Sequence, residues 1–351
     1  MYLTHYSMKG KIAKHWNEYL EKFQPVQKDI YFTEEYVRLY ETDKEKAFCF
    51  IYEENENIFI FPYLRRICKI KNSIEYYDFE TAYGYGGSIS TTNNEDFLQN
   101  AWKIFYETAK ASNYVAGFIR FHPLFNNSKS FNTIGRLIQD RNTIAINLQG
   151  TEEEIWMNEI HTKNRNVIKK GIKTGLVFEV DNTFRNMNEF IEIYNSTMDK
   201  LNADLFYYFT DDYFTNLKNN LSNAFLSVVK YNNQIISSAI FFYDSVWGHY
   251  HLAGSKKEYL NLSPNNFLLW EAAKELRKRN VEYLHLGGGT NSDEDNSLFQ
   301  FKRKFSKSVY QFEIGKVIFN EEIYSDLCNQ WEINNPEKKE MYKYHLLKYK
   351  Y

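Results

Sequence analysis

Cationic side chains suited to electrostatic catalysis gather in the stretch His285 to Lys307, which reads HLGGGTNSDEDNSLFQFKRKFSK. Its basic run contains Lys302, Arg303 and Lys304. A lysine ammonium is a compact charge that stabilises a developing oxyanion most strongly where water is scarce. The alternative is a solvated basic run, which is the usual meaning of such a cluster. The residues alone leave both interpretations open.

A second candidate is His122, in the sequence Arg120-Phe121-His122-Pro123 at the end of a predicted strand. Imidazole titrates near neutral pH, so His122 could accept a proton from a substrate. A histidine before a proline at a strand end is at least as often structural. Catalytic and structural roles both remain open for His122.

Further cations occur between His161 and Gly175, where the basic residues are Lys163, Arg165, Lys169, Lys170 and Lys173 and no acidic residue is present. On a helix, spacings of three and four gather several of them on one face. Such a face could bind phosphates of transfer RNA, a nucleotide or coenzyme A; a solvated helix face is the competing interpretation. Few aromatic residues are interspersed, so sequence-specific RNA readout is not indicated.

Two other clusters give weaker signals. Tyr83 and Tyr85, in AYGYGG, offer hydroxyls and stacking faces to a substrate, although glycines there also fit a simple turn. The acidic run 293–295 has no histidine at a metal-ligand spacing, so we expect a solvated loop and no metal site. The triple glycine 287–289 lacks the spacing of dinucleotide-binding and P-loop motifs.

The elements that position these residues form a degenerate repeat. A β-hairpin is predicted from Phe48 (FCFIYEENENIFIF) and another from Phe225 (FLSVVKYNNQIISSAIFFY). Each is followed by a strand, a helix and a further strand. In the first copy these are 76–90, 95–111 and a strand from 114; in the second they are 247–255, 264 to about 279 and a strand from 281. After Val317 we expect a strand and then a helix that is first acidic and then basic.

Composition sets limits on the class of protein. The 351 residues suggest two domains, and 43% hydrophobic residues suffice for packed cores. A net charge of -2 restricts anion binding to local patches. Three scattered cysteines argue against disulfides or structural zinc and fit a reducing compartment. The N-terminal sixteen residues lack an apolar core and no segment is long enough to span a bilayer, so we expect a cytoplasmic protein with at most peripheral membrane contact.

The segment from His285 resembles the FemABX family of non-ribosomal peptidyltransferases, through a strand ending in Leu-Gly-Gly, an acidic loop and FKxxF. Three more stretches support the resemblance in the expected order: YYDFETAYGYGGS, RFHP and HTKNRNVIKKGIKTGLVFEV. Together they span nearly the whole chain. The region from Asn188 to Tyr213 shows one short helix-like stretch, so the chain resembles family members that lack a coiled-coil arm.

The resemblance implies an α/β (α+β) fold of two GNAT-like domains in tandem. We expect them at 1–150 and 151–316, with 317–351 packing back on the first. It implies an acyl-donor site in the second domain, an acceptor in or near the interdomain cleft, and a charge-stabilising role for Lys302. Where armless members carry an aspartate in Arg-Phe-Asp-Pro, this chain has His122, which puts a peptidoglycan acceptor in doubt. Arg120, Tyr83, Tyr85, Arg303 and the cations Lys163, Arg165 and Lys169 are candidate substrate-binding residues.

Ordinary GNAT enzymes bind the pyrophosphate of coenzyme A with a glycine-rich loop at a helix start. The corresponding place here reads KKEYLNLSPNNF and contains no glycine. Ser263, Asn265 and Asn266 could still present a helix N-terminus to an anion, so they are the candidate cofactor-binding residues. The missing glycines weaken a coenzyme A site without removing it.

The sequence therefore predicts a transferase that moves an aminoacyl or acyl group to an amine of a cell-envelope precursor, peptidoglycan or surface glycan. The donor is aminoacyl-tRNA or acyl-CoA, with no tightly bound cofactor and no DNA partner. One alternative is an acyl-CoA-dependent N-acetyltransferase acting on an amino sugar or another small amine. Another is a non-catalytic binding module that keeps the fold.

Overall fold

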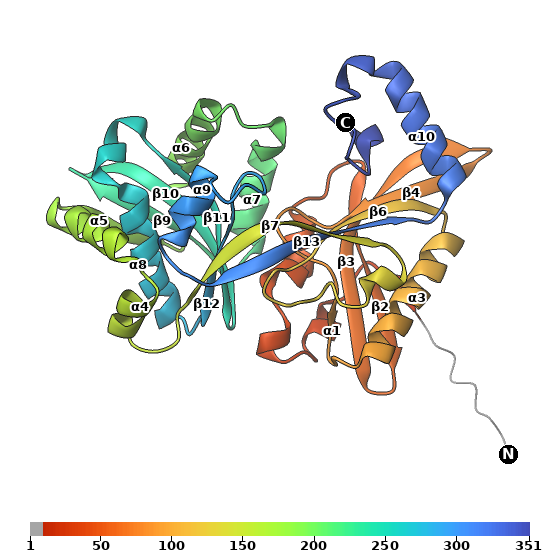
Figure 1. The fold of residues 1–351 in the computed structure, drawn as a ribbon, viewed down its shortest axis with the longest axis horizontal. Helices are drawn as coiled ribbons and strands as arrows, with labels where there is room; N and C mark the ends of the chain where they lie inside the picture. Colours follow the sequence, from red (N-terminus) through yellow and green to blue (C-terminus); the bar gives the residue numbers. More distant parts are fainter. Residues whose placement is uncertain (1–9) are drawn as a thin grey trace. The chain divides into compact units, whose positions relative to one another are not determined.

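The structure is a computed structural model that describes residues 10–351 (Figure 1). The first nine residues lie outside the described residues. They belong to the sixteen N-terminal residues that were noted above to lack an apolar core. Two compact units make up the chain: unit 1 is Met1–Asp140 with Phe312–Tyr351, and unit 2 is Arg141–Gln311. The chain passes from unit 1 to unit 2 within strand β7 (Arg136–Asn147) and returns within β13 (Val309–Ile318).

Unit 1 is a sheet with a helix on each face. Besides parts of β7 and β13, its strands are β1 (Lys11–Ala13), β2 (Glu45–Glu54), β3 (Asn57–Lys71), β4 (Ile74–Glu80), β5 (Ile89–Ser90) and β6 (Tyr114–Arg120). Its helices are α1 (Asn17–Leu20), α2 (Glu34–Arg38), α3 (Glu95–Ala111) and α10 (Glu321–Asn334). The strand order is β1-β2-β3-β4-β6-β13, with β5 paired to β3.

The aromatic content of the first half explains the core of unit 1. Helix α3 begins where the Asn94 side chain accepts the Phe97 backbone N–H at 2.9 Å. The buried face of α3 carries Phe97, Trp102 and Phe105, which pack on aromatic residues of β2, β3 and β4. Helix α10 buries Ile323 and Leu327 in a smaller cluster with residues of β6.

Three expectations for unit 1 need correction. The strand expected after Val317 lies almost entirely before it, as β13, which ends at Ile318. The stretch 76–90 is not one strand, because β4 ends at Glu80 and the glycine-containing segment 81–88 is a loop before the short β5. The C-terminal helix ends at Asn334, so the basic residues that follow are not part of an α-helix. Pro336 cannot continue the helix, and the remaining segment forms turns that bury Leu346 and Leu347.

Unit 2 contains the second copy of the predicted repeat. Its strands, besides parts of β7 and β13, are β8 (Val177–Asp181), β9 (Ala224–Tyr231), β10 (Gln234–Asp244), β11 (Trp247–Ser255) and β12 (Tyr283–Gly288). Its helices are α4 (Glu152–Asn158), α5 (Thr162–Lys173), α6 (Met187–Lys200), α7 (Asp211–Asn220), α8 (Pro264–Lys278) and α9 (Ser297–Arg303). The strand order is β7-β12-β11-β10-β9-β8.

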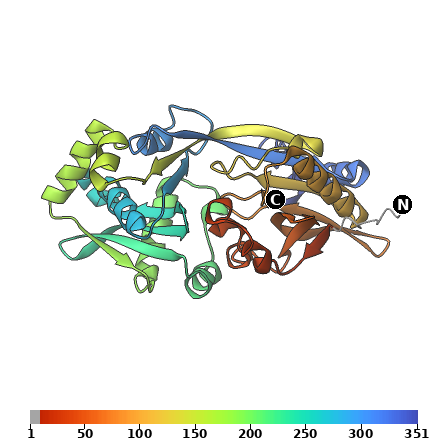
Figure 2. The same ribbon diagram turned by 90° about the horizontal axis from the view of Figure 1, so that it is seen from below.

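Both faces of the unit 2 sheet are covered by helices (Figures 1 and 2). Helix α8 buries Leu269, Ala273 and Leu276 on one face in a core that also takes residues of α5. On the other face α6 lies so close to β11 that a Cβ on Gly254 would come within 2.7 Å of the Ile193 carbonyl oxygen. The predicted strands and helix of this unit are therefore present, in the predicted order.

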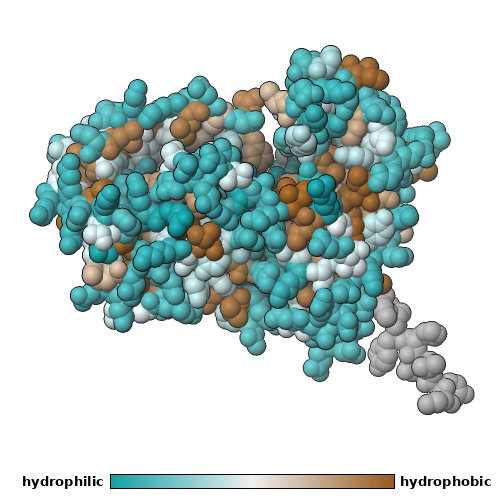
Figure 3. Space-filling model, viewed as in Figure 1, coloured by the Kyte–Doolittle hydropathy of each residue, from teal (hydrophilic) through white to brown (hydrophobic). Residues whose placement is uncertain are grey.

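Across residues 10–351, no helix combines the length and apolar character needed to cross a bilayer. Figure 3 shows mostly hydrophilic side chains on the visible surface, with hydrophobic residues in scattered places.

Candidate active site

The candidate site begins where two parallel strands of unit 2 separate. Strand β12 pairs with β11 at Trp247–Tyr283, Gly248–Leu284 and His249–His285, and the ladder between them ends there. Strand β11 continues to Ser255, and in the described chain its later residues have no β12 partner. The Ser255 N–H donates to the Thr197 side chain at 3.2 Å, and the other β12-facing backbone groups of this part of β11 are placed to pair with an inserted ligand, as strand edges do.

Lys302 is buried at the far end of β12. Helix α9 holds it there: the Asn296 side chain caps the helix start, and Phe299 is buried in the core. The Lys302 ammonium donates to the Gly288 carbonyl at 2.7 Å, and the residue is 7% exposed. Burial, and then the charge of Arg141, lowers the pKa of Lys302 to about 7. A neutral and a cationic form are therefore both accessible near neutral pH.

The triple glycine serves close packing at this strand end. A Cβ on Gly288 would come within 2.6 Å of the Asn142 carbonyl, and one on Gly289 within 2.6 Å of the Asn296 side-chain oxygen. The Gly289 carbonyl accepts a hydrogen bond from Arg141 at 3.0 Å. The glycines thus let the backbone approach β7 and α9, and place two cations beside the end of β12.

Arg141 was not predicted from the sequence. It lies at the start of the unit 2 part of β7, far from Lys302 along the chain, and no motif marks it. Arg303, next to Lys302, is exposed on the surface of α9. Of the basic run, the structure therefore brings Lys302 to the site and leaves Arg303 in solvent.

The proposed cofactor-binding residues at the start of α8 are engaged in internal hydrogen bonds. The Asn265 side-chain oxygen accepts from Ser237 at 2.7 Å and from the Ser255 hydroxyl, and Asn266 donates to Asn164 at 2.7 Å. The backbone of Ser263 is in the left-handed conformation, with a φ of 54°, and its N–H donates to the Leu260 carbonyl.

The backbone at this helix start is also largely committed. Pro264 has no N–H, and the N–H groups of Asn266 and Phe267 both donate to the Ser263 carbonyl. A pyrophosphate site of the ordinary GNAT kind needs several amides directed at the anion. Few remain for that purpose here.

The basic helix predicted between His161 and Gly175 is α5. Arg165 donates to the carbonyl of Trp156 in the last turn of α4 (3.3 Å) and to that of Ile160 just after the helix (2.7 Å), so its guanidinium stabilises this helix end. Lys169 lies 6.0 Å from the Trp156 ring, and Lys163 is exposed. Lys163 and Lys169 remain available to a polyanion, whereas Arg165 caps a helix.

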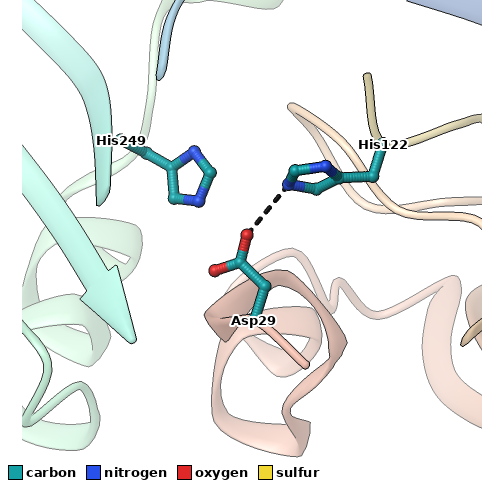
Figure 4. Close-up of side chains that lie close together, drawn as sticks. All are labelled: Asp29, His122 and His249. Carbon is teal, nitrogen blue, oxygen red and sulfur yellow. Dashed lines mark hydrogen bonds and ion pairs between the residues drawn. The ribbon is translucent and has the colours of Figure 1, made fainter. Parts of the chain in front are cut away.

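In unit 1, His122 is fully buried and held at both ring nitrogens. Its Nδ1 accepts the Leu124 N–H at 3.2 Å, so its Nε2 carries the hydrogen that bonds the Asp29 carboxylate at 2.9 Å (Figure 4). The Phe125 ring packs 4.3 Å from the imidazole. Asp29 has no sequence signal, since it is 93 residues away. This geometry fixes the imidazole in one orientation and one tautomer.

Arg120 belongs to a buried ionic cluster of unit 1. Its guanidinium donates to Glu80 at 3.1 Å and to the Thr81 carbonyl at 2.8 Å. Lys350 contacts the same carboxylate and also Glu45 at 2.7 Å. Burial alone would raise the pKa of Glu80, but the charges of Arg120 and Lys350 lower it to about 2.

Tyr83 and Tyr85 are half-buried in a tyrosine-rich region of unit 1. The Tyr36 hydroxyl donates to the Tyr83 carbonyl at 2.6 Å. The Tyr85 ring lies 5.2 Å from Phe312 and 6.0 Å from His122, both edge-on. The structure thus brings Tyr85 and His122 together and holds the backbone of Tyr83.

Comparison with known proteins gives the family context. Residues 160–303 match the family described as acetyltransferase (GNAT) domain. No curated protein matches the sequence. FemX is structurally similar over 90% of this chain and 99% of its own, with a TM-score of 0.69 and 15% identity.

Two further structures share the fold at low identity. One is the C-terminal DUF2156 domain of a protein from Agrobacterium fabrum described as a lysylphosphatidylglycerol synthetase. It is 16% identical, the match covers 86% of this chain and 92% of that chain, and the TM-score is 0.52. The other is L-PGS from Bacillus licheniformis, with 13% identity, coverages of 79% and 85%, and a TM-score of 0.51. The expected tandem GNAT fold and the likeness to FemX are confirmed, and the domain match supports an acyltransferase.

Proposed function

We propose that this chain, which shares its tandem GNAT fold with FemX, transfers an aminoacyl group from a transfer RNA ester to an amine of a cell-envelope precursor, and that unit 2 binds the donor. The observation that carries the proposal is the separation of β11 from β12 after His285, with the buried ammonium of Lys302 bonded to Gly288 further along β12. The unpaired side of β11 offers backbone groups to the donor, and the lysine supplies positive charge in a water-poor place.

The reaction follows from these groups. The acceptor amine attacks the ester carbonyl, and negative charge develops on the carbonyl oxygen. Protonated Lys302, with its Gly288 contact, stabilises that oxygen electrostatically. Collapse of the tetrahedral species forms the amide and releases the alcohol of the donor. Arg141 raises the local positive potential without itself needing to move.

The start of α8 favours an aminoacyl ester over acyl-CoA. Pro264 gives no amide hydrogen there, and the amide hydrogens of Asn266 and Phe267 are already bonded within the chain. A pyrophosphate would find few donors. The exposed cations Lys163 and Lys169 suit a longer polyanion that contacts the surface at several points.

The acceptor class rests on weaker support. One similar structure comes from a protein named for lysylphosphatidylglycerol, an aminoacylated lipid, and FemX shares the whole fold. Both likenesses fit an envelope amine or hydroxyl acceptor. The histidine at position 122, held by Asp29, favours an acceptor different from that of family members with aspartate there.

The test is a transfer assay with two donors and two acceptors. The donors are a transfer RNA pool charged with labelled amino acids and labelled acetyl-CoA; the acceptors are a nucleotide-linked peptidoglycan peptide with a lysine amine, and glucosamine. We expect label to move from transfer RNA to the peptide. Label moving from acetyl-CoA to glucosamine would select the N-acetyltransferase alternative. No transfer from either donor would select the binding module.

A further inference from the structure

Unit 2 holds a tyrosine–histidine pair where β11 leaves β12. The Tyr213 hydroxyl on α7 lies 2.6 Å from His251 Nε2 on β11. His251 is two residues beyond His249, the last β11 residue paired with β12. It also occupies a bulge, because the β10 register steps from Phe241–Tyr250 to Ile240–Leu252 and skips it. Bulges of this kind re-aim a side chain and occur next to active sites.

Both rings of the pair are held by neighbouring aromatic rings. Tyr213 stacks on Phe209 at 4.4 Å, and the Thr210 side chain accepts the Tyr213 N–H at the start of α7. The Phe242 ring lies 4.3 Å from the His251 imidazole. The contact therefore has a fixed geometry, with a short hydrogen bond between two buried or half-buried polar groups.

We propose that Tyr213 is the general acid that protonates the leaving group of the donor, and that His251 is its positioning residue. The inference rests on the proposed function. Lys302 lies at the end of β12 and His251 on β11, so the two strands that separate carry different charge-handling groups. An alkoxide leaving group needs a proton, and a phenol can supply one.

The state of His251 fits this role. Burial, and then the charge of His249, lowers its pKa to about 3, so the imidazole is neutral at physiological pH. In the proposed mechanism His251 takes the Nε2–H tautomer, so that Nε2–H donates to the phenol oxygen and stabilises the phenolate that forms. The groups that face His251 from packed elements include Tyr213, Phe209 and Phe242, and His249 lies on its own strand.

The proton balance closes within the reaction. The amine nitrogen forms a bond to the carbonyl carbon, and the bond from that carbon to the leaving oxygen breaks. The hydrogen of Tyr213 moves to the leaving oxygen, and the phenolate then takes the hydrogen released by the attacking amine. Tyr213 is restored at the end of each turnover, and no further reactant is required.

The test compares leaving groups in the full chain. Each amino acid is offered as its transfer RNA ester, which leaves as an alkoxide, and as an aryl ester, whose phenolate leaves without a proton. Tyr213→Phe keeps the ring and should slow transfer from the transfer RNA ester about 100-fold, but from the aryl ester less than threefold. Tyr259→Phe, which removes an exposed hydroxyl of the same unit, should change neither rate.

The positioning role of His251 is tested by two substitutions. His251→Leu should match the loss in Tyr213→Phe, and His251→Gln should recover part of it because its amide can donate to the phenol oxygen. Equal slowing of both esters in correctly folded Tyr213→Phe, or no slowing, would overturn the proposal while leaving the transferase intact. Wild-type protein that transfers from neither ester would overturn the proposed function and this role together.

Discussion

Each unit contains one equivalent pair of parallel strands, and the two pairs differ in how far they stay hydrogen-bonded. In unit 2, β11 and β12 pair over three positions and then separate. In unit 1, β4 and β6 pair from Tyr77–Tyr114 to Glu80–Phe118, and the contact continues beyond the strands. The Thr81 hydroxyl accepts the Arg120 N–H at 2.9 Å, and a bridge joins Gly86 to Phe121.

This difference in strand pairing indicates which of the two units can accept a ligand between its strands. In unit 1 the backbone groups that a donor would use are consumed by the chain itself, and a buried ionic cluster of Glu80, Arg120 and Lys350 stabilises the closed end. In unit 2 the strands separate, and a buried lysine with lowered pKa is bonded to the end of β12. Closed pairing satisfies the backbone groups within the chain, whereas the open pairing of unit 2 is where the proposed function puts the donor.

The largest expected effect comes from removing the charge of Lys302, at the end of the separating strands β11 and β12. Lys302→Met should lower kcat for aminoacyl transfer about 10²–10³-fold, because an oxyanion donor in a buried site contributes that much. Arg303→Met is the matched control, since its neighbouring cation is exposed, and should stay within twofold. Steady-state kinetics on both variants measures the difference. Equal rates for Lys302→Met and wild type would remove the lysine from the mechanism.

The next effect concerns the stability of the closed pair. Lys350→Met should lower the free energy of unfolding of unit 1 by about 2–3 kcal/mol, because two partly buried carboxylates lose a partner. Lys343→Met removes an exposed lysine and should cost less than about 0.5 kcal/mol. Urea unfolding gives both values. A small loss in Lys350→Met would show that Arg120 alone holds Glu80.

The same cluster sets a dependence on acid. The folded pKa of Glu80, about 2, is below the usual value near 4.5, so its contribution to stability is fully present above that usual value. The contribution is lost as pH falls toward 2. Glu80→Gln should therefore weaken the acid dependence of unfolding between pH 5 and about 2. An unchanged acid profile would contradict the lowered pKa.

Burying Lys302 should cost stability, in contrast to Lys350. Its folded pKa of about 7 lies below the usual 10.5, so the cost is fully present below pH 7 and disappears as pH rises toward 10.5. Lys302→Met should gain about 1–3 kcal/mol near pH 7, and less above pH 9. Thermal unfolding from pH 6 to 10 measures this. A gain that does not change with pH would point to packing alone.

The smallest effect tests whether the closed pair matters to the donor. Thr81→Val removes one hydrogen bond to a backbone N–H and should cost about 1 kcal/mol of stability. The rise in Tm that charged transfer RNA produces should equal that of wild type, because the donor is assigned to unit 2. A smaller Tm shift in Thr81→Val than in wild type would show that unit 1 also takes part in donor binding.

The sequence predicts regular elements well where hydrophobic periodicity dominates. Strand β11 was expected at 247–255 and occupies those residues, and α3 occupies the expected 95–111. The basic C-terminal segment differs from the predicted helix, because its lysines suit a helix while its contacts with α10 and β4 do not.

Site residues were found only where a short motif marked them. Lys302 stands out through FKxxF, and the Ser-Pro-Asn-Asn segment suggested an anion site whose side chains are in fact bonded to Ser237, Ser255 and Asn164. The Tyr213–His251 pair is 38 residues apart and depends on a bulge. Periodicity carries no information about such distant pairings.

The crossing of the chain at β7 and β13 has a consequence for biosynthesis. Unit 2 is a single continuous segment, 141–311, and can bury its core as soon as that segment has left the ribosome. Unit 1 must wait, because β13 pairs with β6 through residues 314–318, made about two hundred residues later. The half of the molecule that is translated first therefore completes its sheet last, and a nascent chain stalled before residue 312 would carry β6 with an open edge.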